Sequence, residues 1–275
     1  SPFGEKGVIG LSGSNGNLRI FINELAEGLK KLSRRLNTRL IMFKDFPKND
    51  CGWLELLKEK GFFKVGSFPS AMNELYFKSF DEYVKSLGSA TRKSLRRRLK
   101  KADNLTRVEI KELDNVDGAA EEVFSLYLNT YRQGMTKFER LTKEFFLSVG
   151  RNMQPHVKIF LYYVNGKMGA FNLCLVYKDL FIDKFIGFDY DISGPSDLYF
   201  LSWCHNIDWC IKNSIRYYQS GQTDYCAKVR LGSRLVPLYA YLRHANFLMN
   251  IILHFLSLML KPDNFDKDIK KTGHG

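Results

Sequence analysis

Cysteine is scarce in this 275-residue chain, and its five cysteines form neither a CxxC pair nor an evenly paired framework. Disulfide-rich secreted domains and zinc modules both depend on such spacing, so the sequence favours neither class. The neighbours of these cysteines are apolar, which is typical of buried, reduced thiols in a cytosolic protein. We therefore predict a cytoplasmic protein that binds no metal. The cysteines are Cys51, Cys174, Cys204, Cys210 and Cys226.

The chain also lacks a visible signal peptide and an apolar run long enough to cross a membrane. Its most apolar stretch, 247–260, is interrupted only by Asn250, His254 and Ser257. As a helix it would be about 21 Å long, against roughly 30 Å of bilayer hydrocarbon. Three positions are open for it: against the body of the protein, against a partner chain, or in a membrane interface as a peripheral contact. Because the first residue is Ser1 rather than Met, we expect an N-terminal segment to be missing.

Acidic residues are in the minority, since 42 Lys and Arg stand against 29 Asp and Glu, for a net charge of +13 and a pI of about 9.4. This balance favours anionic partners such as nucleic acid, phosphorylated cofactors or an acidic membrane face, although it also serves solubility alone. Apolar residues make up 45% of the chain, which is enough for a packed core in one large domain or two small ones.

The densest charge run, TRKSLRRRLKK at 91–101, has the pattern of an amphipathic helix. Leu95 and Leu99 lie four residues apart, so one face can pack while the cations remain outside. A solvated helix face explains this run, and so does a phosphate-binding face for RNA, a nucleotide cofactor or anionic lipid. The run has no interleaved aromatic residues, so base stacking is not indicated. The predicted polyanion-binding residues are Arg96, Arg97 and Arg98.

Hydrophobic periodicity predicts alternating helices and strands along the chain. The predicted helices are 18–36, 51–60, 80–87, 118–132, 142–149 and 198–213. The predicted strands are 38–43, 62–68, 74–77, 108–113, 157–164, 167–177, 180–188 and 215–219. Asn165-Gly166 is a two-residue hairpin turn, so the strands of 157–188 are expected to form an antiparallel meander. Pro69 is expected to end the strand 62–68.

The stretch 217–234, YYQSGQTDYCAKVRLGSR, combines glycines, hydroxyls, an amide and two spaced cations. A loop of this composition offers backbone N–H groups and positive charge, which together hold phosphate or carboxylate. An ordinary turn followed by a solvated helix explains the same residues. Upstream, the loop 192–197 precedes a helix that Ser196 or Asp197 can cap, so unpaired N–H groups lie at its start.

The order of these segments resembles the GNAT superfamily of acyl-CoA N-acyltransferases, in its FemAB-like branch of acetyltransferase and peptidoglycan-biosynthesis proteins. The resemblance covers 80–244. It rests on SATRKSLRRRLKK, AAEEVFSLYLNTY, NGKMGAFNLCLVYKDLFIDKFIGFDYD, LYFLSWCHNIDWCIKN and YYQSGQTDYCAKVRLGSRLVPLYAYLRH. It implies an α/β (α+β) fold with a mixed, mostly antiparallel sheet flanked by helices, in two GNAT-like halves of which the first is incomplete. The implied division is 1–115, 116–246, and 247–275 as apolar helix and polar tail.

One departure from the GNAT pattern bears on the donor. These enzymes usually grip the CoA pyrophosphate with an Arg/Gln-x-x-Gly-x-Gly/Ala loop, where this chain has SGPSDLYF. The resemblance therefore implies either aminoacyl-tRNA or an acyl-CoA longer than acetyl-CoA as co-substrate. It also implies an amine acceptor, no metal, and a donor lying where the strand after the helix splays from its neighbour.

The chemistry implied by the resemblance needs a base for the amine and an acid for the leaving group. Asp183, Asp189 and Tyr190 end the third strand of the meander, and Asp189 is the first candidate for the base. Tyr218 and Tyr225 are candidate acids. A capping carboxylate and core tyrosines explain the same residues. The donor-binding candidates are Ser193, Gly194, Ser196, Ser220, Gly221, Gln222, Lys228 and Arg230.

Two functions from different classes fit the sequence. The first is an acyl- or aminoacyltransferase that acts on an amine. The second is a non-catalytic protein that keeps the fold and binds RNA or an anionic membrane surface. An enzyme needs a cleft in which Asp189, Tyr218 and Lys228 converge, whereas a binding protein needs only a continuous basic surface. The sequence leaves the acyl group, the acceptor and the oligomeric state open.

Overall fold

The computed structural model describes residue 7 and residues 17–105, 107–134 and 140–259. Among them, the chain divides into two compact units. Unit 1 comprises the described residues up to Ala71, then Gln222–Val229, and those from Arg234 onward. Unit 2 comprises Met72–Gly221 and Arg230–Ser233. The predicted division into GNAT-like halves at residue 115 concerns repeats, which compactness does not test, so it stays a prediction.

Unit 1 is built from the two ends of the described chain. Its elements are α1 (Leu18–Arg35), β1 (Leu40–Pro47), the 3₁₀ helices η1 (Lys48–Asp50) and η2 (Glu55–Lys60), α2 (Cys51–Leu54), β2 (Phe63–Glu74) up to Ala71, α9 (Tyr225–Arg230) up to Val229, β8 (Arg234–His244) and α10 (Phe247–Met259). Strands β1 and β8 pair antiparallel, and α1 packs on them through Ile22 and Ala26, both fully buried. The α1 helix begins where the Asn17 side chain accepts the N–H of Arg19 at 3.1 Å.

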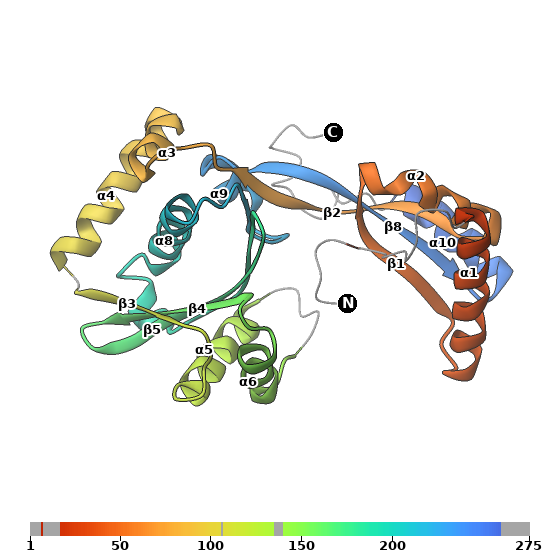
Figure 1. The fold of residues 1–275 in the computed structure, drawn as a ribbon, viewed down its shortest axis with the longest axis horizontal. Coiled ribbons are helices and arrows are strands. Elements are labelled where there is room, and N and C mark those ends of the chain that lie inside the picture. The colour runs from red at the N-terminus through yellow and green to blue at the C-terminus, as the bar shows by residue number, and fades with distance from the viewer. Residues whose placement is uncertain (1–6, 8–16, 106, 135–139, 260–275) are drawn as a thin grey trace. The chain divides into compact units, whose positions relative to one another are not determined.

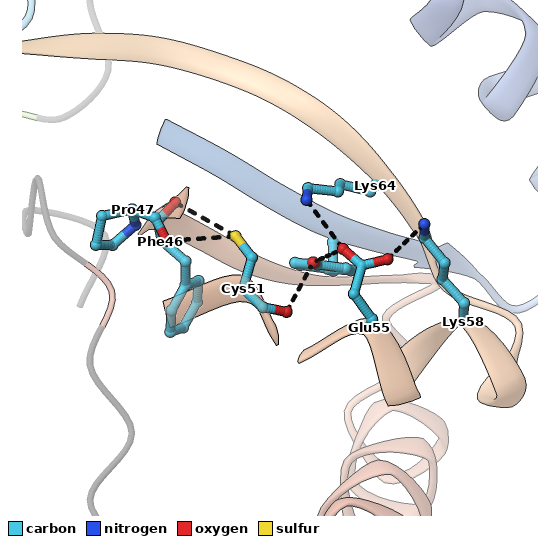
Figure 2. A network of polar contacts seen from close by, with 7 residues as sticks. Phe46, Pro47, Cys51, Glu55, Lys58 and Lys64 are labelled. Atoms are coloured by element: carbon cyan, nitrogen blue, oxygen red, sulfur yellow. Dashed lines mark hydrogen bonds and ion pairs between the residues drawn. The ribbon is translucent and has the colours of Figure 1, made fainter. Parts of the chain in front are cut away.

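A polar network holds the 3₁₀ segment of unit 1 to its sheet (Figure 2). The Glu55 carboxylate accepts from Lys58 at 2.5 Å, from Lys64 at 2.9 Å and from the Tyr241 hydroxyl at 2.6 Å. The Cys51 thiol donates to the Pro47 carbonyl at 3.4 Å. Partial burial by itself would raise the pKa of Glu55, but these donors outweigh it and lower the pKa to about 2. The network therefore holds Glu55 in its ionised form.

Unit 2 contains the elements from α3 to β7. They are α3 (Phe80–Ser86), α4 (Ser89–Leu105), β3 (Val108–Leu113), α5 (Ala120–Gln133), α6 (Lys143–Asn152), β4 (Val157–Val164), β5 (Lys167–Tyr177), β6 (Leu180–Phe188), α7 (Tyr190–Ser193), α8 (Leu198–Lys212) and β7 (Tyr217–Gln219). Its strands, with the end of β2, lie in the order β2-β7-β6-β5-β4-β3. The described pairs are antiparallel except β6–β7, which is parallel. The predicted fold class and the meander of 157–188 are confirmed.

The turn between β4 and β5 explains why the meander could be predicted from the sequence. Asn165 and Gly166 have φ values of 51° and 83°, the positive pair that a two-residue hairpin turn requires. Val164 then pairs with Lys167, and after a shift of one residue between Tyr163 and Tyr162 the pairing runs back to Val157 opposite Leu175. Buried residues alternate poorly on β5 because helices cover both of its faces.

Helix α8 lies on one face of the unit 2 sheet, and α5 with α6 on the other (Figure 1). On the α5 face, a Cβ at Gly187 would come within 2.7 Å of the Tyr127 backbone nitrogen and 2.4 Å of the Phe171 ring. Only a residue without a side chain lets the α5 backbone approach β6 so closely. On the α8 face, Trp203 and Tyr218 meet edge to face at 4.9 Å. The sheet is thus the middle layer of unit 2.

The predicted end of the strand 62–68 at Pro69 is wrong. Strand β2 runs through Pro69 to Glu74, where a break at Pro69 and a separate strand at 74–77 were expected. Proline lacks only the N–H donor, and its φ is compatible with an extended chain, so the strand tolerates Pro69. The Pro69 carbonyl still accepts a hydrogen bond from the Tyr225 hydroxyl at 2.9 Å. The stretch 217–234 contains the helix α9, which agrees with the alternative of a turn followed by a helix.

Candidate active site

The parallel strands β6 and β7 form a fork in unit 2. They pair over three residues each, from Leu180 opposite Tyr217 to Ile182 opposite Gln219. Strand β7 ends at Gln219, whereas β6 continues to Phe188. From Asp183 onward, no described strand pairs with the β7 side of β6. A strand edge of this kind can bind an extended ligand through its backbone N–H and C=O groups.

A β-bulge lies at the base of the fork. In the β5–β6 register, Cys174 pairs with Asp183 and Leu173 with Phe185, so Lys184 is one extra residue in β6. A bulge re-aims the side chains on either side of it, and bulges are frequent next to active sites. Here Asp183 lies on the α8 face. Beyond Lys184 the pairing of β6 with β5 resumes with a shift of one residue.

Five polar side chains meet on the α8 face at this point. The Tyr218 hydroxyl donates to Asp183 Oδ2 at 2.8 Å, and Asn172 Nδ2 donates to Asp183 Oδ1 at 2.6 Å. Asn206, from α8, donates to Asn172 Oδ1 at 2.7 Å and to Asp183 Oδ2 at 3.3 Å. The Cys174 thiol donates to Asn172 Oδ1 at 3.1 Å. We call this group the Asp183 cluster; it contains one carboxylate surrounded by neutral donors.

Burial fixes the protonation of the neutral members of the cluster. Burial raises the pKa of Tyr218 well above its ordinary value, and the Asp183 charge raises it further. The same two causes, with Cys210, raise the pKa of the Cys174 thiol. Both groups therefore remain protonated and donate, while Asp183 is only partly buried. Asp183 is thus the one member of the cluster that is not fully buried.

An unsatisfied hydroxyl lies on the same face. Tyr162 is fully buried, and within the described part of the chain its hydroxyl has no hydrogen-bond partner. Burial raises its pKa first, followed by the nearby Cys174 and Asp183. Its ring lies 6.0 Å from the ring of His205 on α8. A buried donor without a partner is unusual, and a catalytic role or a bound water is among the explanations for one.

The predicted basic helix and the predicted anion-binding helix N-terminus come together in unit 2. Asp197 begins α8 with a φ of 52°, and its carboxylate forms an ion pair with Arg98 of α4. The Arg98 guanidinium also lies 4.1 Å from the centroid of the Phe200 ring. Ser196 beside it is buried. This ion pair therefore neutralises Arg98 internally, whereas Arg96 and Arg97 are exposed and remain available to a polyanion.

Asp189, the predicted base, is the N-cap of the short helix α7. Its carboxylate accepts the N–H of Asp191 at 3.0 Å, and its carbonyl accepts the N–H of Ser193 at 2.7 Å. Ser193 is buried, and the N–H of Gly194 donates to the Tyr190 carbonyl at 3.3 Å. The geometry is that of a capping carboxylate, and the catalytic role of Asp189 stays a prediction.

The remaining predicted site residues are divided between the units. Ser220 and Gly221 follow β7 in unit 2, with Ser220 buried and Gly221 at a φ of 85°, and Arg230 of unit 2 is exposed. Gln222, Tyr225 and Lys228 belong to unit 1. Their convergence with unit 2 residues around one pocket stays a prediction.

Within unit 1 these three residues have structural contacts. Gln222 donates to the Phe68 carbonyl at 2.7 Å, and the Tyr225 hydroxyl donates to the Pro69 carbonyl at 2.9 Å. Lys228 is 5% exposed.

Sequence reasoning missed Asn172 and Asn206, the two amides that hold Asp183. The available signal was an amide inside the apolar strand sequence AFNLCLV, because a buried amide requires partners. Among the residues that the structure describes, no group of His, Cys, Asp and Glu side chains could hold a metal ion. The described helices include none that is both long enough and apolar enough to span a bilayer.

Comparisons with known proteins give one family and one fold. The model of the FemAB-like family, described as peptidoglycan biosynthesis/recognition, matches residues 13–260. A C-terminal domain assigned to a lysylphosphatidylglycerol synthetase from Agrobacterium fabrum superposes with a TM-score of 0.58 at 14% identity, over 86% of this chain and 76% of that one. The structure of FemX gives 0.57 at 10% identity, over 86% and 79%.

A tandem GNAT protein from the clavulanic acid biosynthesis pathway gives a TM-score of 0.52 at 12% identity, over 84% of this chain and 72% of that one. At such identities the likeness concerns the fold. Comparison with curated protein sequences gave no match.

Proposed function

The chain belongs to the FemAB-like family, and from that premise we propose that it is a transferase that moves an acyl or aminoacyl group onto an amine. The observation that supports this most is the β6–β7 fork with the Asp183 cluster at its base. A partly exposed carboxylate lies there beside a strand edge that can bind an extended donor. The family description further supports a peptidoglycan precursor as the source of the amine.

The proposed reaction forms a bond between the amine nitrogen and the carbonyl carbon of the donor. The bond that breaks joins this carbon to the sulfur of a thioester or to the oxygen of an ester. The amine loses one proton and the leaving group gains one. Asp183 accepts the proton from the attacking amine, and backbone N–H groups of the β6 edge stabilise the oxyanion.

Tyr218 and Asn172 position the carboxylate in this proposal. Tyr218 is fully buried, so its hydroxyl reaches Asp183 rather than the leaving group. Two donors on opposite oxygens fix the plane of the Asp183 carboxylate. The role of acid for the leaving group, predicted for Tyr218 and Tyr225, has no support from the contacts of either residue.

The donor is proposed to be aminoacyl-tRNA or an acyl-CoA. The exposed pair Arg96 and Arg97 supports a donor with phosphate groups. The sequence SGPSDLYF in place of the usual pyrophosphate loop favours aminoacyl-tRNA or a longer acyl-CoA over acetyl-CoA. Names among the structural neighbours include both a lysylphosphatidylglycerol synthetase and a tandem GNAT protein. The cytoplasmic location stays a prediction.

The experiment that tests this proposal is a mass-resolved transfer assay with the full chain. Bulk aminoacylated tRNA and a panel of CoA esters are supplied separately, with a peptidoglycan stem peptide carrying a free lysine as acceptor. We expect one donor class to add its acyl mass to the peptide amine. Asp183→Asn should lower this rate by about 10²–10⁴, the usual effect of removing a general base.

Two matched variants accompany it. Asp208→Asn removes a partly exposed carboxylate of α8 that pairs with Lys212, and it should leave the rate unchanged. Asp189→Asn replaces one good capping residue by another, so α7 should persist. A large loss of rate in Asp189→Asn with little loss in Asp183→Asn would move the base to Asp189, as the sequence predicts. Acceptor left unmodified by both donor classes would contradict the proposed function.

A further inference from the structure

Helix α10 of unit 1 turns its polar side toward the protein. Asn250 accepts the N–H of His244 at 2.7 Å and donates to the Gly61 carbonyl at 3.0 Å. One turn further on, His254 stacks on the Phe63 ring with centroids 5.0 Å apart. Residues four apart share one face of a helix, so a single polar stripe makes these contacts.

The rest of the α10 surface is apolar and faces away from unit 1. None of its residues is buried. Nine large apolar side chains are between 38% and 74% exposed: Phe247, Leu248, Met249, Ile251, Ile252, Phe255, Leu256, Leu258 and Met259. At 3.6 residues per turn they cover an arc of roughly 200°. A water-facing helix has the opposite arrangement, with the polar side outward.

The exposed apolar surface is not confined to the helix. Leu40 and Met42 on β1 are 46% and 50% exposed, and they pair with His244 and Leu242 at the end of β8 from which α10 leaves. Apolar areas of this extent on a soluble surface mark an interaction site. We call this surface, α10 with Leu40 and Met42, the α10 face.

Charge identifies the chemistry that would cover the α10 face. From Arg234 to Met259 the chain has two arginines and no acidic residue, and from Leu18 to Ala71 it has eleven Lys and Arg against six Asp and Glu. An apolar helix on a cationic unit matches the layered chemistry of an anionic bilayer, with acyl chains beneath phosphate groups. A single flat protein surface would leave part of a 200° arc in water, whereas a lipid interface surrounds it.

We propose that α10 lies in the plane of an anionic lipid surface, with its apolar side among the acyl chains. Asn250 and His254 hold the helix to unit 1 from above, and Arg243, with other cations of the unit, meets the phosphate groups. At 13 residues the helix is about 20 Å long, which suits a position along the interface rather than across it. This inference is independent of the transfer chemistry proposed for unit 2.

The test is flotation of the full chain with vesicles of phosphatidylcholine containing about one third phosphatidylglycerol, beside vesicles of phosphatidylcholine alone. We expect the protein to float with the anionic vesicles and to partition less onto the neutral ones. Phe247→Gln/Leu248→Gln/Phe255→Gln should lower the partition coefficient by about tenfold or more, because membrane binding scales with the apolar area inserted.

The matched control is Ile20→Gln/Leu32→Gln/Leu36→Gln, which removes exposed apolar side chains in and just after α1. It should float like the parent protein. Failure of the parent to float, or equal loss in both triple variants, would overturn the proposal. So would light scattering that finds a dimer without vesicles and a monomer for the α10 variant, because the face would then join two copies of the chain.

Discussion

The hydroxyl of Tyr218 donates a hydrogen bond of 2.8 Å to the carboxylate of Asp183, at the point where strands β6 and β7 part. The bond joins two neighbouring parallel strands, and the connection between them in the chain contains the crossover helix α8. A buried phenol of raised pKa remains a donor over the whole working pH range, so the orientation of the carboxylate depends on it. The first prediction follows from this dependence.

Tyr218→Phe should lower the proposed transfer rate, because the Asp183 carboxylate loses a donor that positions it. Tyr83→Phe is the control: Tyr83 is also buried, and its hydroxyl donates to the Leu231 carbonyl at 2.8 Å and accepts from Trp203 at 3.1 Å. Both variants should lose about 1–3 kcal/mol of unfolding free energy. Only Tyr218→Phe should lower the transfer rate; an equal loss of rate in both variants would make the effect one of packing.

The second prediction separates exposed from internally paired arginines. Arg96→Gln/Arg97→Gln should weaken binding to bulk tRNA and make the plot of log K against log salt shallower by about 1.5–2, since two phosphate contacts are lost. Arg34→Gln/Arg35→Gln on α1 removes another exposed arginine pair and should leave the slope unchanged. Identical slopes for parent and Arg96→Gln/Arg97→Gln would assign α4 to the solvated helix face that the sequence equally allows.

How far the sequence predicts this molecule depends on whether local or distant contacts decide each feature. The meander is local: Asn165-Gly166 specifies the turn, and alternation specifies the strands. The choice between Asp183 and Asp189 is not local, because the bulge at Lys184 decides which side chains face α8, and it has no evident sequence signal. The amide Asn172, inside an apolar strand, was the one available indication of a buried polar cluster.

The orientation of helix α10 is also decided by a distant contact and was not predictable from the sequence. Its apolar composition and its length are evident in the sequence, and three environments were consistent with them. The side that faces unit 1 is fixed by Asn250 reaching Gly61, 189 residues earlier in the chain. No local pattern contains that contact. The family resemblance, in contrast, was predicted from the order of segments and is confirmed over residues 13–260.

The third prediction concerns pH and unit 1. Glu55 has a pKa of about 2 in the folded protein, below its ordinary value of 4.5, so the folded state binds fewer protons there than the unfolded chain. The contribution of this carboxylate to the unfolding free energy is complete above about pH 4.5 and is lost as the pH falls toward 2. Urea unfolding of Glu55→Gln should therefore show a shallower loss of stability over that range than the parent. Glu24→Gln, at an exposed position on α1, should follow the parent curve.

The last prediction tests the close approach of α5 to β6 by comparing two glycines. Gly187 of β6 lies against the α5 backbone, whereas Gly28 of α1 has open space beside it. A Cβ at Gly187 would meet the Leu126 carbonyl carbon and the Tyr127 nitrogen, both at 2.7 Å, and neither backbone atom can move without shifting α5. Gly187→Ala should therefore cost about 1–3 kcal/mol of unfolding free energy, as overpacking does. A Cβ at Gly28, in the middle of α1, would meet nothing within 4 Å. Gly28→Ala should raise the unfolding free energy by about 0.5–1 kcal/mol through helix propensity. Opposite signs in denaturant unfolding would support the described packing of α5 on β6; stabilisation by both substitutions would place α5 further from the sheet.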